Sequence, residues 1–124
     1  MKRTMSEVKY ELAHVGINGQ NPEEAKEIAA LFADIFNLKV REGNSSTFAG
    51  NAVEVMRTPF LGKHGHIGMY TPDCEAAVQD LQARGYEADM STAKYKPDGT
   101  LNAVYLKREV GGFAVHIVRA PESR

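Results

Sequence analysis

Two short segments of this 124-residue sequence each occur twice, in the same order, and this repeat constrains the fold more than any other feature. Residues 14–17, with the sequence HVGI, recur as HIGM at residues 66–69. Residues 52–57, AVEVMR, recur as AVHIVR at residues 114–119. Such a repeat indicates that the chain consists of two similar structural modules.

A side chain that can bind a metal ion stands at each matched position, and these are His14, Glu54, His66 and His116. Strand alternation places all four on one face, where Gly16 and Gly68 leave room beside an ion. The pattern predicts one divalent ion, with Zn, Ni, Mn, Co and Fe left open. The alternative is a metal-free binding cavity in which these side chains hydrogen-bond to one another.

The first module has the pattern of a βαβββ unit. Residues 10–18 alternate as a strand, and Asn21 followed by Pro22 is typical of a helix start. An apolar stripe at helical spacing is expected to be core, and it comprises Ile28, Leu31, Phe32 and Ile35. Three short strands are expected at about 38–42, 47–49 and 52–58, with turns at 44–46 and 50–51.

The second module repeats this order after a linker at 59–65. We expect a strand at 66–70, a helix that begins at 71–73 and ends at Gly85, and strands near 86–90, 101–107 and 113–119. Neither module has enough apolar surface to fold alone. The sequence therefore predicts one α+β domain over residues 8–120, with modules at about 8–59 and 62–120. A pseudo-twofold would relate the modules, and a mixed sheet with helices outside would enclose the metal cavity.

Charge and cysteine content bound the partners and the compartment. The net charge of −1 gives no electrostatic case for nucleic acid or a membrane surface. The single cysteine, Cys74, cannot form an internal disulfide, no apolar run is long enough to cross a bilayer, and no signal-peptide pattern follows the basic first residues. We expect a cytoplasmic protein, with Cys74 in a structural role on a helix.

Substrate-binding candidates share the strand face of the metal cluster or lie near it, and they are Tyr105, Lys107, Asn18 and Tyr70. Lys107 and Tyr105 could bind an anionic substrate, or they could belong to a solvent-facing edge. His64 is interpreted as a rim residue of the linker.

The order HVGI…AVEV…HIGM…AVHI, within paired βαβββ units, resembles the vicinal oxygen chelate superfamily, which includes glyoxalase I, methylmalonyl-CoA epimerase and extradiol dioxygenases. The resemblance covers about residues 10–120. It implies metal ligands on the first and last strands of each module, at His14, Glu54, His66 and His116. Glyoxalase I and the epimerases carry a proton-shuttling Glu at the last of these positions. The histidine here argues against lactoylglutathione lyase activity and leaves the metal site in place.

A narrower resemblance links this chain to the glyoxalase-type domain appended to some bacterial KHG/KDPG aldolases. It rests on residues 43–50 (GNSSTFAG), 60–63 (FLGK) and 103–118 (AVYLKREVGGFAVHIV). Those aldolases use a Schiff-base lysine in a (β/α) barrel, which needs about 200 residues or more. The chain is too short for that barrel, so the aldolase reaction itself is not expected.

Three imidazoles and one carboxylate leave up to two open positions on a six-coordinate ion, which suits a substrate with two adjacent oxygens. The sequence therefore predicts a glyoxalase-type isomerase or lyase that acts on a small 2-oxo or 2-hydroxy carbonyl compound through an enediolate. Glu54 is the catalytic candidate, and the base is either Glu54 or a metal-bound hydroxide. The alternative is a non-enzymatic binding protein or an accessory domain to aldolase metabolism. A homodimer is expected, because exposed sheet edges are usually covered.

Overall fold

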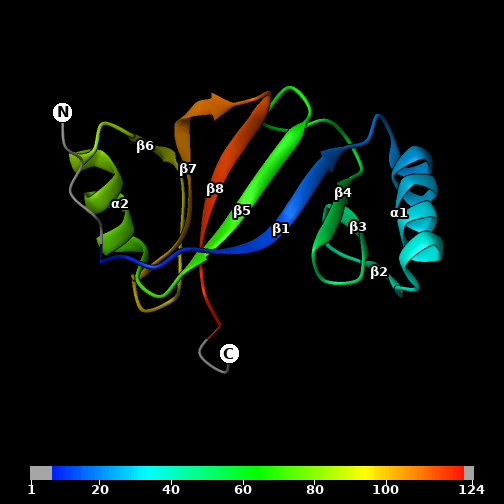
Figure 1. The fold of residues 1–124 in the computed structure, drawn as a ribbon, viewed down its shortest axis with the longest axis horizontal. Helices are drawn as coiled ribbons and strands as arrows, with labels where there is room; N and C mark the ends of the chain where they lie inside the picture. The colour runs from blue at the N-terminus through cyan, green and yellow to red at the C-terminus, as the bar shows by residue number, and fades with distance from the viewer. Residues whose placement is uncertain (1–6, 122–124) are drawn as a thin grey trace.

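A computed structural model of the chain describes residues 7–121 and contains two βαβββ modules in succession (Figure 1). The first comprises β1 (Glu11–Asn18), α1 (Pro22–Phe36), β2 (Val40–Glu42), β3 (Ser46–Ala49) and β4 (Val53–Met56). The second comprises β5 (Gly65–Thr71), α2 (Cys74–Ala83), β6 (Ala88–Tyr95), β7 (Leu101–Val110) and β8 (Phe113–Arg119). The element order agrees with the repeat in the sequence.

All eight strands form one mixed sheet in the order β2-β3-β4-β1-β5-β8-β7-β6. The first strands of the two modules, β1 and β5, pair antiparallel at its centre. Each of them also pairs in parallel with the last strand of its own module, β1 with β4 and β5 with β8. The pairing is therefore the same on both sides of the β1–β5 junction, as a pseudo-twofold between the modules requires.

Both helices begin where the sequence indicates. The side chain of Asn21 accepts a hydrogen bond from the backbone N–H of Glu24 at 2.8 Å and caps α1. Asp73 caps α2 in the same way through the N–H of Ala76 at 3.1 Å. Asn37 ends α1 in the left-handed conformation, and Gly85 follows α2 with a φ of 94°. These caps set where each helix begins and ends.

The helices lie at opposite ends of the molecule and pack on the same face of the sheet (Figure 1). Val55 and Ile17 contact the α1 cluster, and Ile117 and Met69 contact the α2 cluster. These side chains belong to the apolar strand face that the alternation predicts. The opposite face, which carries the histidines, is left free of both helices.

The buried face of α1 differs from the stripe expected from the sequence. Ile28 and Phe32 pack on the core, but Leu31 and Ile35 are 63% and 67% exposed. The fully packed positions are alanines four residues apart, Ala25, Ala29 and Ala33. Small side chains let the helix axis approach β3 and β4 closely, so the large residues beside them remain at the surface.

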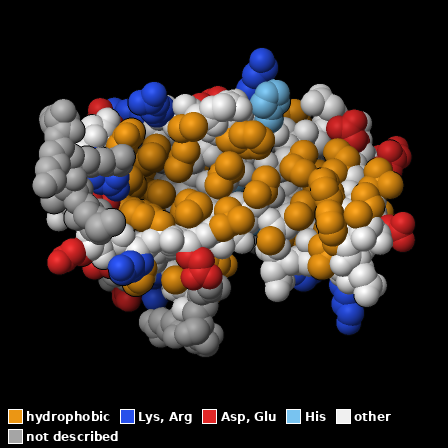
Figure 2. All heavy atoms as spheres, viewed as in Figure 1, with side chains coloured by type: hydrophobic (Ala, Val, Ile, Leu, Met, Phe, Trp, Pro, Cys, Tyr) orange, Lys and Arg blue, Asp and Glu red, His pale blue; other side chains and the backbone are white. Residues whose placement is uncertain are grey.

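A strip of apolar surface separates the two cores. Val15 and Ile67, which are opposite each other on β1 and β5, are half-buried and pack into neither of the clusters that the described residues form. Figure 2 shows hydrophobic side chains gathered over the central strands and along the side of α1 that faces them. The sheet centre therefore has no covering layer within the described chain.

Candidate metal centre

Strand register brings the four predicted ligands together around two glycines. Gly16 on β1 is opposite Glu54 on β4 and opposite His66 on β5. Gly68 on β5 is opposite His14 on β1 and His116 on β8. Each glycine thus has one ligand candidate on either side, and the two sets are related by the pseudo-twofold.

Both glycines are needed because the imidazole rings occupy the space of their missing side chains. A Cβ atom on Gly16 would overlap the ring of His66, and one on Gly68 would overlap the ring of His14. The ring of His66 therefore lies over Gly16 of β1 and that of His14 over Gly68 of β5, with the two ring planes 79° apart.

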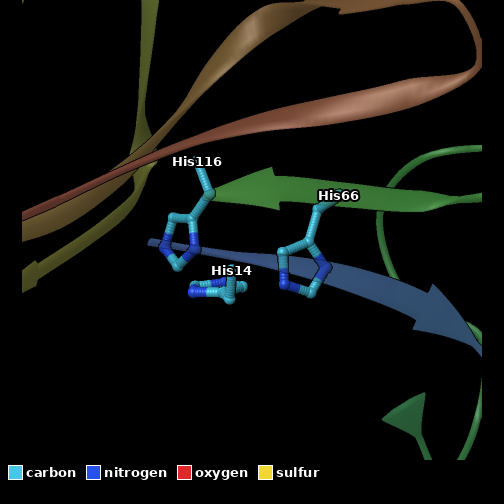
Figure 3. A group of neighbouring side chains, drawn as sticks. All are labelled: His14, His66 and His116. Atoms are coloured by element: carbon cyan, nitrogen blue, oxygen red, sulfur yellow. The ribbon is translucent and has the colours of Figure 1, made fainter. Parts of the chain in front are cut away.

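The three histidines lie close enough to share one ion, and the carboxylate of Glu54 lies beside two of them. Ring nitrogens of His14, His66 and His116 lie within 4.8 Å of one another, and the rings turn toward one another from β1, β5 and β8 (Figure 3). Oε1 of Glu54 lies 3.1 Å from Nε2 of His66 and 3.6 Å from Nε2 of His14. The structure therefore brings the three histidines together and places Glu54 beside His14 and His66.

The cluster contains buried polar atoms that lack a partner. Among the described residues, no hydrogen-bond partner reaches Nε2 of His14, Nδ1 of His66 or Nδ1 of His116, although all three atoms are buried. Burying such an atom unpaired costs on the order of 1–3 kcal/mol. Three imidazoles and a carboxylate also form a donor set suited to a borderline divalent ion. The residues present therefore fit a metal ion.

Burial sets the protonation state of the cluster. Burial lowers the pKa of His116 to about 3, and the neighbouring His66 and His14 lower it further. Burial also lowers the pKa of His14, although the negative charge of Glu54 acts to raise it. Burial alone would raise the pKa of Glu54, but hydrogen bonds from His66 and Ser46 outweigh it and hold that pKa below its ordinary value. At neutral pH His14 and His116 are neutral and Glu54 is ionised, and metals bind these residues in those states.

Sequence reasoning missed Ser46, which holds the carboxylate in place. Its hydroxyl donates to Oε2 of Glu54 at 2.8 Å, and the residue is only 1% exposed. The other oxygen, Oε1, is left facing the histidines. The sequence assigned Ser46 to a turn, whereas it begins β3, so its partner could be found only from the β3–β4 register.

Tyr105 lies beside the cluster, on β7. Its ring stacks on His116 with centroids 4.0 Å apart and planes 2° apart, and it meets the ring of His66 edge-on at 6.0 Å. The residue is 7% exposed. Burial, with the nearby charge of Glu54, raises the pKa of Tyr105 to about 12, so the phenol stays neutral. Of the predicted substrate-binding residues, Tyr105 contacts the histidines directly.

Lys107 and Asn18 are engaged elsewhere. Nζ of Lys107 pairs with Glu87 at 2.6 Å, and both side chains are more than half exposed. The side-chain amide of Asn18 binds the backbone of Phe60 and Gly62. Strand alternation predicts the face of the sheet on which these two residues lie, but it does not predict which groups their side chains contact. Lys107 is turned to the sheet edge, and Asn18 lies at the end of β1.

Tyr70 and His64 lie at the borders of the site. Tyr70 is on the same face of β5 as His66 and lines a hollow of about 460 Å³ at the strand ends, together with Tyr10 and Glu11. His64 is exposed, as expected for a rim residue, and its ring lies 5.8 Å from that of Phe113.

Neither helix within residues 7–121 is long and apolar enough to span a bilayer.

Comparison with known proteins identifies the fold. No profile of a protein family matches the sequence, and no curated protein matches it. A hypothetical protein from Bacillus halodurans matches in structure with a TM-score of 0.63 at 15% identity, over 91% of this chain and 96% of that one. Methylmalonyl-CoA epimerase from Mycobacterium tuberculosis matches with a TM-score of 0.57 at 17% identity, over 90% and 89%. The chain has the vicinal oxygen chelate fold.

A third match supports the same assignment. A methylmalonyl-CoA epimerase in complex with methylmalonyl-CoA and NH4+ aligns with a TM-score of 0.60 at 15% identity, over 90% of this chain and 95% of that one. Nearly full coverage of both chains means that the two vicinal oxygen chelate modules, and not a fragment, are shared. At this identity the likeness concerns the fold, and the chemistry has to be argued from the residues of the site.

Proposed function

We propose that the chain is a metal-dependent isomerase or lyase acting on a small 2-oxo or 2-hydroxy carbonyl compound. The observation that carries this proposal is the set of buried, unpartnered ring nitrogens of His14, His66 and His116 beside the ionised Glu54. These four residues would hold one divalent ion and leave up to two positions for adjacent substrate oxygens. When bound, the ion would supply a Lewis acid that stabilises negative charge on a substrate oxygen.

Glu54 is the residue suited to accept a proton from the carbon beside the carbonyl. Its lowered pKa keeps it ionised, and the hydrogen bond from Ser46 fixes its orientation. His116 is neutral at pH 7 in the described cluster because its pKa lies at about 3. A neutral imidazole held against Tyr105 has a ligand's role rather than that of an acid.

The structural neighbours support an isomerase. Two of the three structures compared above are methylmalonyl-CoA epimerases, and one of these holds methylmalonyl-CoA, a compound whose reacting carbon is next to a carbonyl. From these epimerases we carry over to the present chain only the removal of a proton from a carbon next to a carbonyl, because the fold is what the chains share.

The direct test is anaerobic incubation of metal-loaded protein in D₂O with 2-oxo acids, 2-hydroxy ketones and glutathione hemithioacetals, followed by proton NMR. We expect metal-dependent exchange of the proton next to the carbonyl, with loss of exchange in Glu54→Gln. Lack of exchange for every compound would contradict an isomerase.

The second candidate is a binding protein or an accessory domain of sugar-acid aldolase metabolism, without catalysis of its own. It is favoured by His116, which stands where glyoxalase I and the epimerases are expected to carry a proton-shuttling carboxylate. Tight ligand binding without deuterium exchange, or activity only with a partner aldolase, would support this candidate over the enzyme.

We further propose a homodimer formed through the uncovered apolar face. Leu31, Ile35 and Phe36 on α1 are each more than 60% exposed, and the half-buried Val15 and Ile67 continue this surface across the sheet centre. A second copy suits it, because a surface that spans the pseudo-twofold can pair with itself about a true twofold. Exposed apolar side chains that continue from a helix onto a neighbouring sheet are typical of an interface.

The cytoplasm remains the proposed compartment. Cys74 is fully buried, and burial raises its pKa to about 11, so the thiol is unreactive and its place is structural. A protein that uses no disulfide suits a reducing compartment.

A further inference from the structure

Phe60 stands on the segment that joins the two modules, between β4 and β5. The side chain of Asn18 holds this segment in place: its amide donates to the carbonyl of Gly62 at 2.9 Å and of Phe60 at 3.4 Å. Its Oδ1 accepts the N–H of Phe60 at 3.1 Å. Two of these hydrogen bonds hold the backbone of Phe60 itself, and they come from the end of the strand that also carries His14.

A series of aromatic rings connects Phe60 to the metal cluster. The ring of Phe60 meets that of Tyr105 at 6.0 Å with the planes 67° apart, and Tyr105 in turn stacks on His116. Edge-to-face and stacked pairs at these distances are favourable arrangements. Phe60 thus lies one ring beyond the residues that contact the proposed ion.

Exposure differs sharply between these two aromatic residues. Tyr105 is 7% exposed, so its ring is almost fully enclosed, whereas Phe60 is 55% exposed. The next residue, Leu61, is also 39% exposed. Phe60 and Leu61 therefore form an exposed apolar surface beside the cluster, on a backbone segment that Asn18 holds in place. Binding sites for small molecules commonly combine such an apolar wall with a few polar groups.

We propose that Phe60 is a specificity-determining residue, which contacts a flat aromatic substituent of a substrate whose adjacent oxygens reach the His14–Glu54–His66–His116 cluster. This inference rests on the proposed function and narrows its substrate class to aryl-substituted 2-hydroxy or 2-oxo acids. Asn18 is the positioning residue, since it acts through the backbone of Phe60.

The test compares two ligands that differ only in a phenyl group, lactate and phenyllactate. Their dissociation constants are measured on Zn²⁺-loaded protein by calorimetry, or by NMR titration where binding is weak. We expect wild type to bind phenyllactate about tenfold more tightly or better, because ring contact adds affinity beyond that of the shared oxygens. Phe60→Ala should reduce this preference to about threefold or less and leave lactate binding unchanged.

Two further variants separate the specific effect from general damage. Tyr95→Ala removes an aromatic ring of similar exposure, 58%, on β6, and should keep the preference. Asn18→Ala should weaken the preference without weakening lactate binding, since it frees the segment and leaves the cluster intact. Thermal unfolding of each variant checks that the fold is retained.

The possible failures are distinct. Equal binding of the two acids by wild type, or an unchanged preference in Phe60→Ala, would overturn the role of Phe60 and leave the proposed function standing. If neither acid binds protein that has been shown to hold Zn²⁺, the inference is overturned, and deuterium exchange over the wider panel decides the proposed function separately.

Discussion

Gly16 lies directly opposite His66 across β1 and β5, and the imidazole ring occupies the space that a side chain on Gly16 would need. We predict that Gly16→Ala displaces the ring and lowers metal affinity roughly 10- to 100-fold, the range typical of disturbed ligand orientation. Competition with a chelator of known affinity measures this loss.

Gly99→Ala is the control for this variant. Gly99 has a φ of 89°, and no atom lies within 4 Å of an added Cβ, so the substitution strains a turn away from the cluster. It should lower the free energy of unfolding by about 1 kcal/mol and leave metal affinity unchanged. Equal metal affinity in the two variants would mean that Gly16 does not orient His66.

Ser46→Ala should weaken both metal binding and deuterium exchange. The substitution removes the hydroxyl that binds Oε2 of Glu54, which leaves the carboxylate free to rotate and raises its pKa toward the ordinary value. We expect a loss of metal affinity of about tenfold or more, measured by chelator competition at pH 7. Ser45→Ala, at the exposed neighbouring position, should match wild type.

Metal-free protein should lose stability as the pH falls below about 6.5, the ordinary pKa of histidine. His116 has a pKa of about 3 in the fold, so between these values the unfolded chain binds a proton that the folded chain does not. The expected loss is on the order of 4 kcal/mol by pH 3. Urea unfolding across this range, with a chelator present, measures it.

His116→Gln provides the comparison for the acid profile. The amide does not titrate, so the free energy of unfolding of this variant should depend less steeply on pH between 6.5 and 3. Parallel profiles for the variant and wild type would show that the acid sensitivity arises from other groups.

The homodimer is tested by light scattering at tens of micromolar, where weak association is visible. Wild type should have twice the mass of one chain. Ile35→Glu should be monomeric, because it places a charge in the exposed apolar surface of α1. Val110→Glu, at the β7–β8 turn and similarly exposed, should remain dimeric. Monomeric wild type would exclude this interface.

The module order and the pairing of the histidine-bearing strands with one another could be approached from the sequence, because both depend on local periodicity and on the repeat. Strand alternation put His14, Glu54, His66 and His116 on one strand face, and the repeat identified them as matched positions of the two modules. The alternation within one strand does not show which other strands belong to the same site. The repeat does, because it matches the strands of one module with those of the other.

Features that depend on the distances between helices and strands could not be predicted from the sequence. The alanine face of α1, centred on Ala29, reflects how closely the helix approaches β3 and β4. β6 runs to Tyr95, beyond the expected end at Met90, because Lys94 and Tyr95 pair with β7. Lys107 has the correct strand parity but pairs with Glu87 at the surface.

Metal content is the most direct test of the central claim. We predict about one divalent ion for each wild-type chain after supplementation with Zn, Ni, Mn, Co or Fe, and loss of this ion in His66→Ala, as measured by elemental analysis. His64→Ala, at an exposed histidine two residues away, should retain the metal. Equal metal content in wild type and His66→Ala, or no bound metal after all supplements, would contradict the account.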